Sequence, residues 1–174
     1  MAETANTVAK CSIPAQSLLD PHAVETAWFR DSWRAPLAHP DISVTDIFFA
    51  VFGHRPGWMK FIMVVRNGIA SLAGLETPTR SEIMTPAKRT SYHAGEKIGA
   101  WPLFALTENE LIAGRDNSHL DFRLSVLKEN DCVYISTICN VHNRFGKVYL
   151  TCVEPFHRWG IRMLIAGAVQ SGRL

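Results

Sequence analysis

The chain has 174 residues, of which 47% are hydrophobic and 20% are charged, so its composition argues against intrinsic disorder, collagen-like repeats and a disulfide scaffold. A single domain of this length buries about 70% of the surface that its unfolded chain exposes. Lysine and arginine number 18 and aspartate and glutamate 16, and the resulting net charge of +2 is too small to indicate a nucleic-acid-binding protein.

Residues 1–20 are small and polar and are expected to form a mobile lead-in, which leaves residues 21–174 as a single folded domain. The acidic Glu3 and the lack of an apolar run before Ser12 are untypical of a signal peptide. The cysteines form no CxxC pair and are expected to be reduced thiols. The longest apolar stretch, residues 58–75, is interrupted by charged and amide side chains. We therefore expect a cytoplasmic protein without a transmembrane segment.

The first half of the chain is predicted to contain one strand and two helices. The strand is expected within residues 25–37, and Pro36 and Pro40 mark the end of this segment. Ser43, with an acid three residues later, predicts the start of a short helix. A longer helix is expected over residues 56–74, where apolar side chains recur at three- and four-residue spacing. The polar loop 76–93 is long enough to act as a lid or to be disordered.

The hydrophobic pattern changes from helical to strand-like after residue 100. Four runs of strand-forming residues are separated by short polar turns, which predict antiparallel neighbours, and these runs are 101–106, 111–114, 120–127 and 132–141. Asn143 can cap a terminal helix that runs to about Val169. The apolar side of that helix, expected to pack on the sheet, consists of Phe145, Val148, Tyr149, Cys152, Phe156, Trp159 and Met163.

The predicted order of elements is a strand, two helices, an antiparallel meander and a long helix. A curved sheet that grips one long helix buries the apolar side of that helix, and a ligand cavity remains wherever side chains do not fill the space. The predicted fold class is therefore α+β, with a curved antiparallel sheet wrapped around a long C-terminal helix. This order resembles the helix-grip fold of the START, polyketide-cyclase and birch-pollen-allergen (SRPBCC) superfamily.

Three segments carry a closer resemblance. The sequences GRDNSHLDFRLS (114–125), VHNRFGKVYL (141–150) and PFHR (155–158) resemble an uncharacterised bacterial family, domain of unknown function 2867 (DUF2867), and the similarity extends from about Asp31 to Ala168. In that family the domain stands alone or follows a nicotinamide-binding Rossmann domain, so the resemblance implies an oxidoreductase-like protein as a partner. GxGxxG, P-loop and GxSxG motifs are absent from the sequence, and no cofactor is expected.

The strand predicted around residues 120–126 carries the main candidate site. Because side chains alternate along a strand, His119, Asp121 and Arg123 share one face and the apolar side chains share the other. If the polar face lines a cavity, Asp121 can pair with Arg123 while His119 presents its imidazole to a bound carbonyl or carboxylate. If it is an outer face, its side chains are solvated and the apolar face packs on the terminal helix.

Three further residues are candidate ligand contacts. Asn140 and His142 share a face of the last strand, where they either fix the end of the terminal helix or contribute hydrogen-bond donors at the mouth of a cavity. Trp101 either stacks on a flat ligand or belongs to the core. A metal site would need His119, Asp121 and His142 to converge on one face, and we predict no bound metal.

Three functions are compatible with this pattern. The first is binding of a small hydrophobic or amphipathic ligand between the sheet and the terminal helix, with His119, Asp121 and Arg123 at its polar end. The second is an enzyme in which His119 acts as a general base on a ketone or polyketide-like substrate and Arg123 stabilises the developing negative charge. The third is a non-catalytic domain that docks on an oxidoreductase-like partner.

The C-terminal segment is unevenly charged. From Arg144 to Leu174 there are five basic residues and one acid, Glu154, so this segment has a net charge of +4. Its helix cations, among them Lys147 and Arg162, are either solvated, attract anionic lipid head groups or contact an acidic partner. An exposed apolar edge strand would also suit a homodimer.

Overall fold

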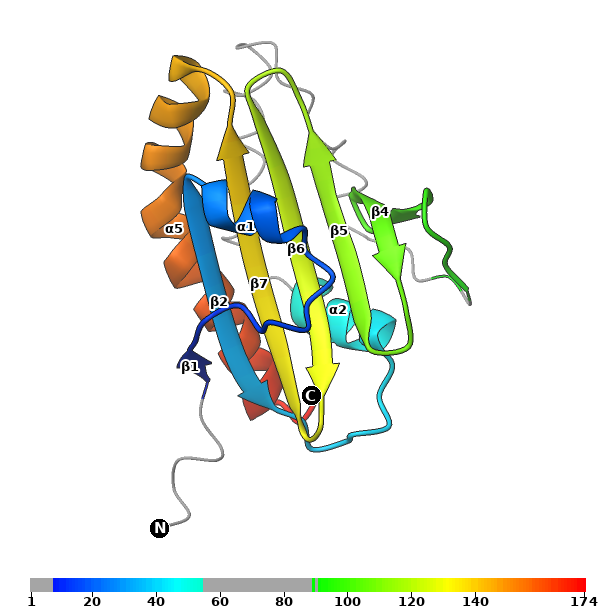
Figure 1. The fold of residues 1–174 in the computed structure, drawn as a ribbon. Coiled ribbons are helices and arrows are strands. Elements are labelled where there is room, and N and C mark those ends of the chain that lie inside the picture. Colours follow the sequence, from blue (N-terminus) through cyan, green and yellow to red (C-terminus); the bar gives the residue numbers. More distant parts are fainter. Residues whose placement is uncertain (1–7, 55–88, 90) are drawn as a thin grey trace.

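The computed structural model describes residues 8–54, 89 and 91–174. Within these residues the chain forms a seven-stranded antiparallel sheet with the strand order β1-β2-β7-β6-β5-β4-β3 (Figure 1). The strands are β1 (Ala9–Lys10), β2 (Phe29–Pro36), β3 (Lys97–Ile98), β4 (Trp101–Leu106), β5 (Glu110–Asp116), β6 (Leu120–Glu129) and β7 (Cys132–Val141). Consecutive strands from β4 to β7 pair with one another, which confirms the predicted meander.

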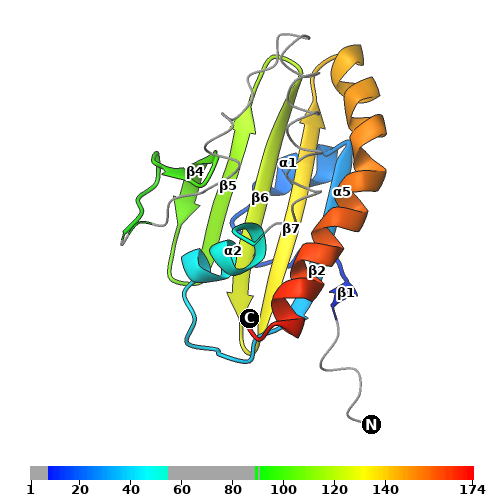
Figure 2. The ribbon, with the colours of Figure 1, turned by 180° about the vertical axis from the view of Figure 1, so that it is seen from behind.

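Helices lie on both faces of the sheet. The helices α2 (Val44–Phe52) and α5 (Arg144–Gln170) lie on one face, which we call the α5 face (Figures 1 and 2). The short helix α1 (Pro21–Thr26) and the segment before it lie on the other, which we call the α1 face. The fold is thus α+β, with a long C-terminal helix against a curved antiparallel sheet in a helix-grip-like layout.

Helix α2 begins and ends where its sequence predicts. Ser43 is the N-cap, and its hydroxyl accepts a hydrogen bond from the Asp46 amide at 3.1 Å. Gly53 ends the helix by donating its backbone N–H to Phe49 O. The longer helix predicted over residues 56–74 lies outside the described residues, as does most of the loop 76–93.

Helix α5 also begins as predicted, but the prediction of which side packs on the sheet is wrong. Asn143 caps the helix by accepting from the Gly146 amide at 3.0 Å. The helix residues that are buried are Gly146, Leu150, Gly160, Ile161, Ile165 and Ala168. The large side chains of the expected packing side are instead 43% exposed at Phe145, 55% at Trp159 and 66% at both Val148 and Phe156. At Gly146 the helix approaches the end of the sheet closely, since a Cβ there would overlap His119 O and lie 2.8 Å from Val141 Cγ1.

The segment before α1 is hydrogen-bonded to the sheet over its described part. Strand β1 pairs with β2, and the Cys11 amide donates to Ser32 O at 3.0 Å. Helix α1, which sequence analysis did not predict, is capped by Asp20 and starts at Pro21. It has only six residues and none of them is buried, so its sequence has no repeated apolar spacing from which a helix could be predicted.

Candidate functional site

A polar cluster on the α1 face contains most of the candidate residues. Asp121 Oδ1 lies 3.0 Å from His142 Nε2. Arg123 forms a two-pronged ion pair with Asp116, with one Nη2–Oδ2 distance of 3.0 Å, and covers the Phe104 ring at 3.7 Å from its centroid. Arg123 thus pairs with Asp116, and the contact observed for Asp121 is with His142. Asp116 stands opposite Asp121 in the register of β5 and β6, and the two acids take different partners, Arg123 and His142.

The polar face of β6 is turned away from α5. Leu124 and Val126, which alternate with the polar side chains, belong to the core cluster that includes Ile161 and Ile165 of α5. The polar side chains are part-exposed on the opposite side, at 35% for Asp121 and 44% for His142. Of the two arrangements that the sequence left open, the structure has the one in which the apolar face packs on the helices.

The remaining candidates hold helix ends or fill the core. Asn140 Nδ2 donates to Ala23 O at 3.1 Å, so it fixes the end of α1 and not that of α5. The start of α5 is supported by His119, whose Nδ1 lies 2.9 Å from Nδ2 of the cap residue Asn143. Trp101 packs edge-on against two phenylalanines of α2 with ring centroids 5.7 and 5.8 Å apart, as a core residue does.

Glu110 is a buried acid that sequence analysis took for part of a polar turn. It is 2% exposed and accepts three hydrogen bonds at 2.6 Å each, from Ser17 Oγ, Leu18 N and Ser125 Oγ. Because Ser17 and Leu18 precede α1, this carboxylate ties the N-terminal segment to the sheet. No sequence signal could have found it, since its partner Ser17 is 93 positions away.

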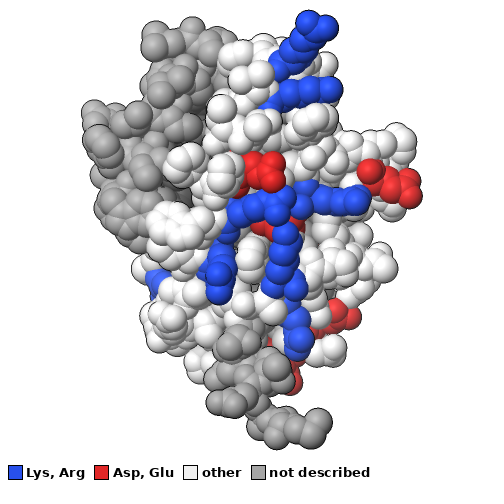
Figure 3. Space-filling view, turned by 90° about the vertical axis from the view of Figure 1, so that its left-hand side faces the viewer, with Lys and Arg blue, Asp and Glu red and all other residues white. Residues whose placement is uncertain are grey.

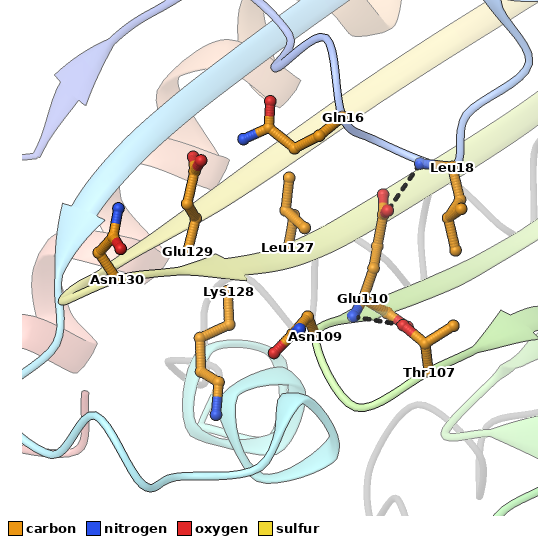
Figure 4. Close-up of a pocket in the computed structure, with 9 residues that line it drawn as sticks. All are labelled: Gln16, Leu18, Thr107, Asn109, Glu110, Leu127, Lys128, Glu129 and Asn130. Atoms are coloured by element: carbon orange, nitrogen blue, oxygen red, sulfur yellow. Dashed lines mark hydrogen bonds between the residues drawn. The ribbon is translucent and has the colours of Figure 1, made fainter.

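An open pocket of about 410 Å³ lies beside Glu110 on the α1 face (Figure 4). Its lining combines two leucines with polar and charged side chains and consists of Gln16, Leu18, Thr107, Asn109, Glu110, Leu127, Lys128, Glu129 and Asn130. Lys128 Nζ donates to Pro40 O and Ile42 O, each at 3.2 Å. Two of the three charged side chains of this wall, Glu110 and Lys128, are thus already engaged by the protein itself.

A second buried acid, Asp31, lies on the α5 face. It is 4% exposed, and its cross-strand partner on β7, Thr137, is 2% exposed. Asp31 Oδ2 accepts from Trp33 Nε1 at 2.8 Å. Asp31 Oδ1 has no hydrogen-bond donor among the described atoms, and the nearest cation is Lys10 Nζ at 3.7 Å. A carboxylate has about four acceptor sites, so Asp31 is under-supplied with donors for a buried acid.

Asp31 and Thr137 divide the apolar contact between α5 and the sheet. On one side of them, Leu150 of α5 packs with Phe29 and Cys139. On the other side, Ile161 and Ile165 belong to the larger cluster of the core. The stretch of α5 between these contacts carries polar side chains, including His157, whose ring meets Phe29 edge-on at 5.3 Å. Asp31 and Thr137 therefore lie between two apolar contacts of α5, and their neighbour in the register on β6 is the apolar Leu124.

The alternation of β2 contains a signal for Asp31 that sequence analysis did not use. Asp31 lies on the same face of the strand as Phe29 and Ala35, which are both buried. The exposed Arg30 and Arg34 lie on the other face. The two-residue period of a strand therefore places Asp31 on the covered face of β2.

The described part of the chain was searched for a metal site and for a membrane-spanning helix. Within residues 8–54 and 91–174, no group of three or more His, Cys, Asp and Glu side chains is arranged to hold a metal ion. None of the helices described in the same ranges is long and apolar enough to cross a membrane.

A comparison with models of known protein families shows to which family the chain belongs. The model of DUF2867, described as a protein of unknown function, matches residues 23–164. The chain belongs to the DUF2867 family. The matched region of this DUF2867 protein contains Asp31, the polar cluster on the α1 face and most of α5. No curated protein and no solved structure matches the chain.

Proposed function

We propose that this DUF2867 protein binds a small amphipathic molecule between the sheet and α5, with the polar group of the ligand at Asp31. The observation that carries the proposal is the buried Asp31 Oδ1, which has only an ion pair at 3.7 Å and no hydrogen-bond donor among the described atoms. A buried acceptor left without a hydrogen bond destabilises a protein by about 1–3 kcal/mol. A ligand donor at Oδ1 would relieve that cost.

The surroundings of Asp31 narrow the chemistry of the ligand. A negative charge on the ligand is disfavoured beside Asp31, so a hydroxyl, an amine or an ammonium group suits this position best. Thr137, which pairs with Asp31 in the register of β2 and β7, supplies a hydroxyl at this position. Leu124, Leu150 and Phe29 supply apolar contacts on the same face. We therefore infer a neutral or cationic amphipathic molecule.

The polar end of the proposed site differs from the one expected from the sequence. Asp121 and Arg123 lie on the α1 face, and His119 supports the cap of α5, so none of them is available beneath the helix. The open pocket beside Glu110 has a volume that suits a small molecule. We favour the Asp31 position because its acid lacks donors, whereas Glu110 already accepts three hydrogen bonds.

The test uses N-phenyl-1-naphthylamine, a neutral fluorescent amine with one N–H donor. We expect the wild-type protein to bind this probe and Asp31→Asn to bind it at least tenfold more weakly, because a hydrogen bond to a charged group contributes about 1.5–3 kcal/mol. Asp121→Asn is the matched control, since it removes an acid from the same sheet on the opposite face. Thermal unfolding checks that both variants fold.

Two results contradict the proposed position. One is equal binding of the probe by the wild-type protein and Asp31→Asn. The other is loss of binding in Leu18→Ala, which alters the open pocket on the α1 face and leaves the α5 face unchanged. The second result would assign binding to the pocket beside Glu110.

A specific contact also favours a second candidate function, proton transfer. Asp121 Oδ1 lies 3.0 Å from Nε2 of His142, a contact that orients the imidazole. The base would be His142 and not His119, which is held at the cap of α5. We would measure deuterium uptake at the α-carbon of simple ketones, and uptake that His142→Ala does not slow would exclude this role.

A further inference from the structure

The outer side of α5 carries a stripe of exposed apolar side chains. The outer stripe consists of Phe145, Val148, Cys152, Phe156 and Trp159. Its four large members are 43–66% exposed, and all five residues are exposed in a part of the chain that the structure describes. Monomeric proteins rarely expose contiguous apolar surface of this kind without a binding role.

The spacing of the outer stripe suits a second helix. Its members are separated by three, four, four and three residues, an average of 3.5, which is the period of a coiled-coil seam. Such a seam is narrow, whereas a helix that lies on a membrane presents a broad apolar face. The pattern therefore favours a helical partner over a lipid surface.

Positive charge runs along one border of the outer stripe. Lys147 Nζ lies 4.7 Å from the centroid of the Trp28 ring, and the Arg158 guanidinium lies 5.3 Å from that of Phe29, so both cations lean towards the β2 side of α5. Glu154, the only acid of α5, is paired with Arg158 at 2.6 Å. Figure 3, which views this side of the molecule, shows more basic than acidic side chains on it.

Arg162 is exposed and follows Arg158 by four residues, so it lies on the same side of α5. We propose that the outer stripe of α5 docks an amphipathic helix of another protein, with acidic side chains along the border that faces Lys147 and Arg162. Charge complementarity selects this partner, because a second copy of the chain would bring the same cations to the interface. The proposal goes beyond ligand binding, since it concerns the side of α5 that faces away from Asp31 and the sheet.

The test uses a synthetic amphipathic helix as the probe. Its sequence has leucine at the two seam positions of each of three heptads and glutamate at the flanking positions, and the control peptide has lysine in place of glutamate. We expect the acidic peptide to bind the full chain, with an affinity that falls as salt is added, and the lysine peptide to bind at least tenfold more weakly. Cys152 lies within the stripe and is exposed, so bound peptide should slow its reaction with a maleimide.

Variants assign the binding to this surface. The double variant Phe156→Ala/Trp159→Ala should weaken binding of the acidic peptide at least tenfold, and Lys147→Gln/Arg162→Gln should reduce its salt dependence. Phe104→Ala is the control, because it removes an exposed aromatic ring from a different part of the surface. All of these side chains are exposed or part-exposed, so the variants are expected to fold.

Five results would overturn the proposal. Equal binding of both peptides removes the role of charge, and binding of neither peptide removes the helical partner. A Cys152 that resists maleimide in the isolated monomer shows that the chain covers the stripe itself. A dimer in sedimentation that protects Cys152 assigns the stripe to a second copy. Binding to vesicles that contain phosphatidylserine, without binding to the acidic peptide, assigns it to a membrane.

Discussion

Replacing Glu110 by alanine tests how the N-terminal segment is held on the sheet. The substitution removes one buried carboxylate and the acceptor of three hydrogen bonds of 2.6 Å, from Ser17 Oγ, Leu18 N and Ser125 Oγ. A hydrogen bond to a charged group contributes about 1.5–3 kcal/mol, and the two hydroxyls can rotate towards other acceptors whereas the Leu18 amide cannot. We therefore expect a loss of about 3 kcal/mol, which lowers the ratio of folded to unfolded protein by about two orders of magnitude.

The assay for Glu110→Ala is urea unfolding combined with hydrogen exchange. The midpoint should fall without a change in slope, and the amides of residues 11–27 should lose protection first, because this segment loses its anchor. Glu108→Ala is the matched control, an exposed acid in the same turn, and it should stay within about 0.5 kcal/mol of the wild type. A Glu110→Ala variant that is as stable as this control would refute the assignment of Glu110 as an anchor.

Three further substitutions test the termini of the helices. Gly146→Ala should destabilise the protein by more than about 2 kcal/mol, because the new Cβ would overlap His119 O and lie 2.8 Å from Val141 Cγ1. In the same helix, the Cβ added by Gly167→Ala would meet no neighbouring part of the fold within 4 Å, so this variant should be more stable by up to about 1 kcal/mol. Calorimetry of the two variants compares them, and equal effects would contradict the close approach at Gly146. Asn143→Ala should cost about 1 kcal/mol through loss of the α5 cap, and an unchanged midpoint in urea would contradict that role.

The meander and the helix boundaries were predictable because their determinants are local. Alternation and polar turns define β4 to β7, and the caps Ser43 and Asn143 are read directly from residue type. The side of α5 that packs on the sheet was not predictable in this way. The helix has an apolar stripe on each side, and the buried Gly146, which permits a close approach to His119 and Val141, has no weight in a count of hydrophobic side chains.

The candidate site was predicted less well, because its contacts join distant parts of the chain. Alternation in β6 identifies a polar face that contains Asp121 and Arg123, but it does not say which layer covers that face. Their partners are Asp116, on the neighbouring strand β5, and His142, which directly follows β7, and both become adjacent only through the register of the sheet. Asp31 is buried for the same reason, since α5 comes from the other end of the chain.

Native mass spectrometry of the protein purified from its natural source tests the proposed ligand site most directly. We predict a bound neutral or cationic small molecule at a ratio of one per chain, which denaturation releases and which Asp31→Asn loses while Asp121→Asn keeps. A ligand retained at the same ratio by Asp31→Asn would contradict the assignment of Asp31 as its polar contact.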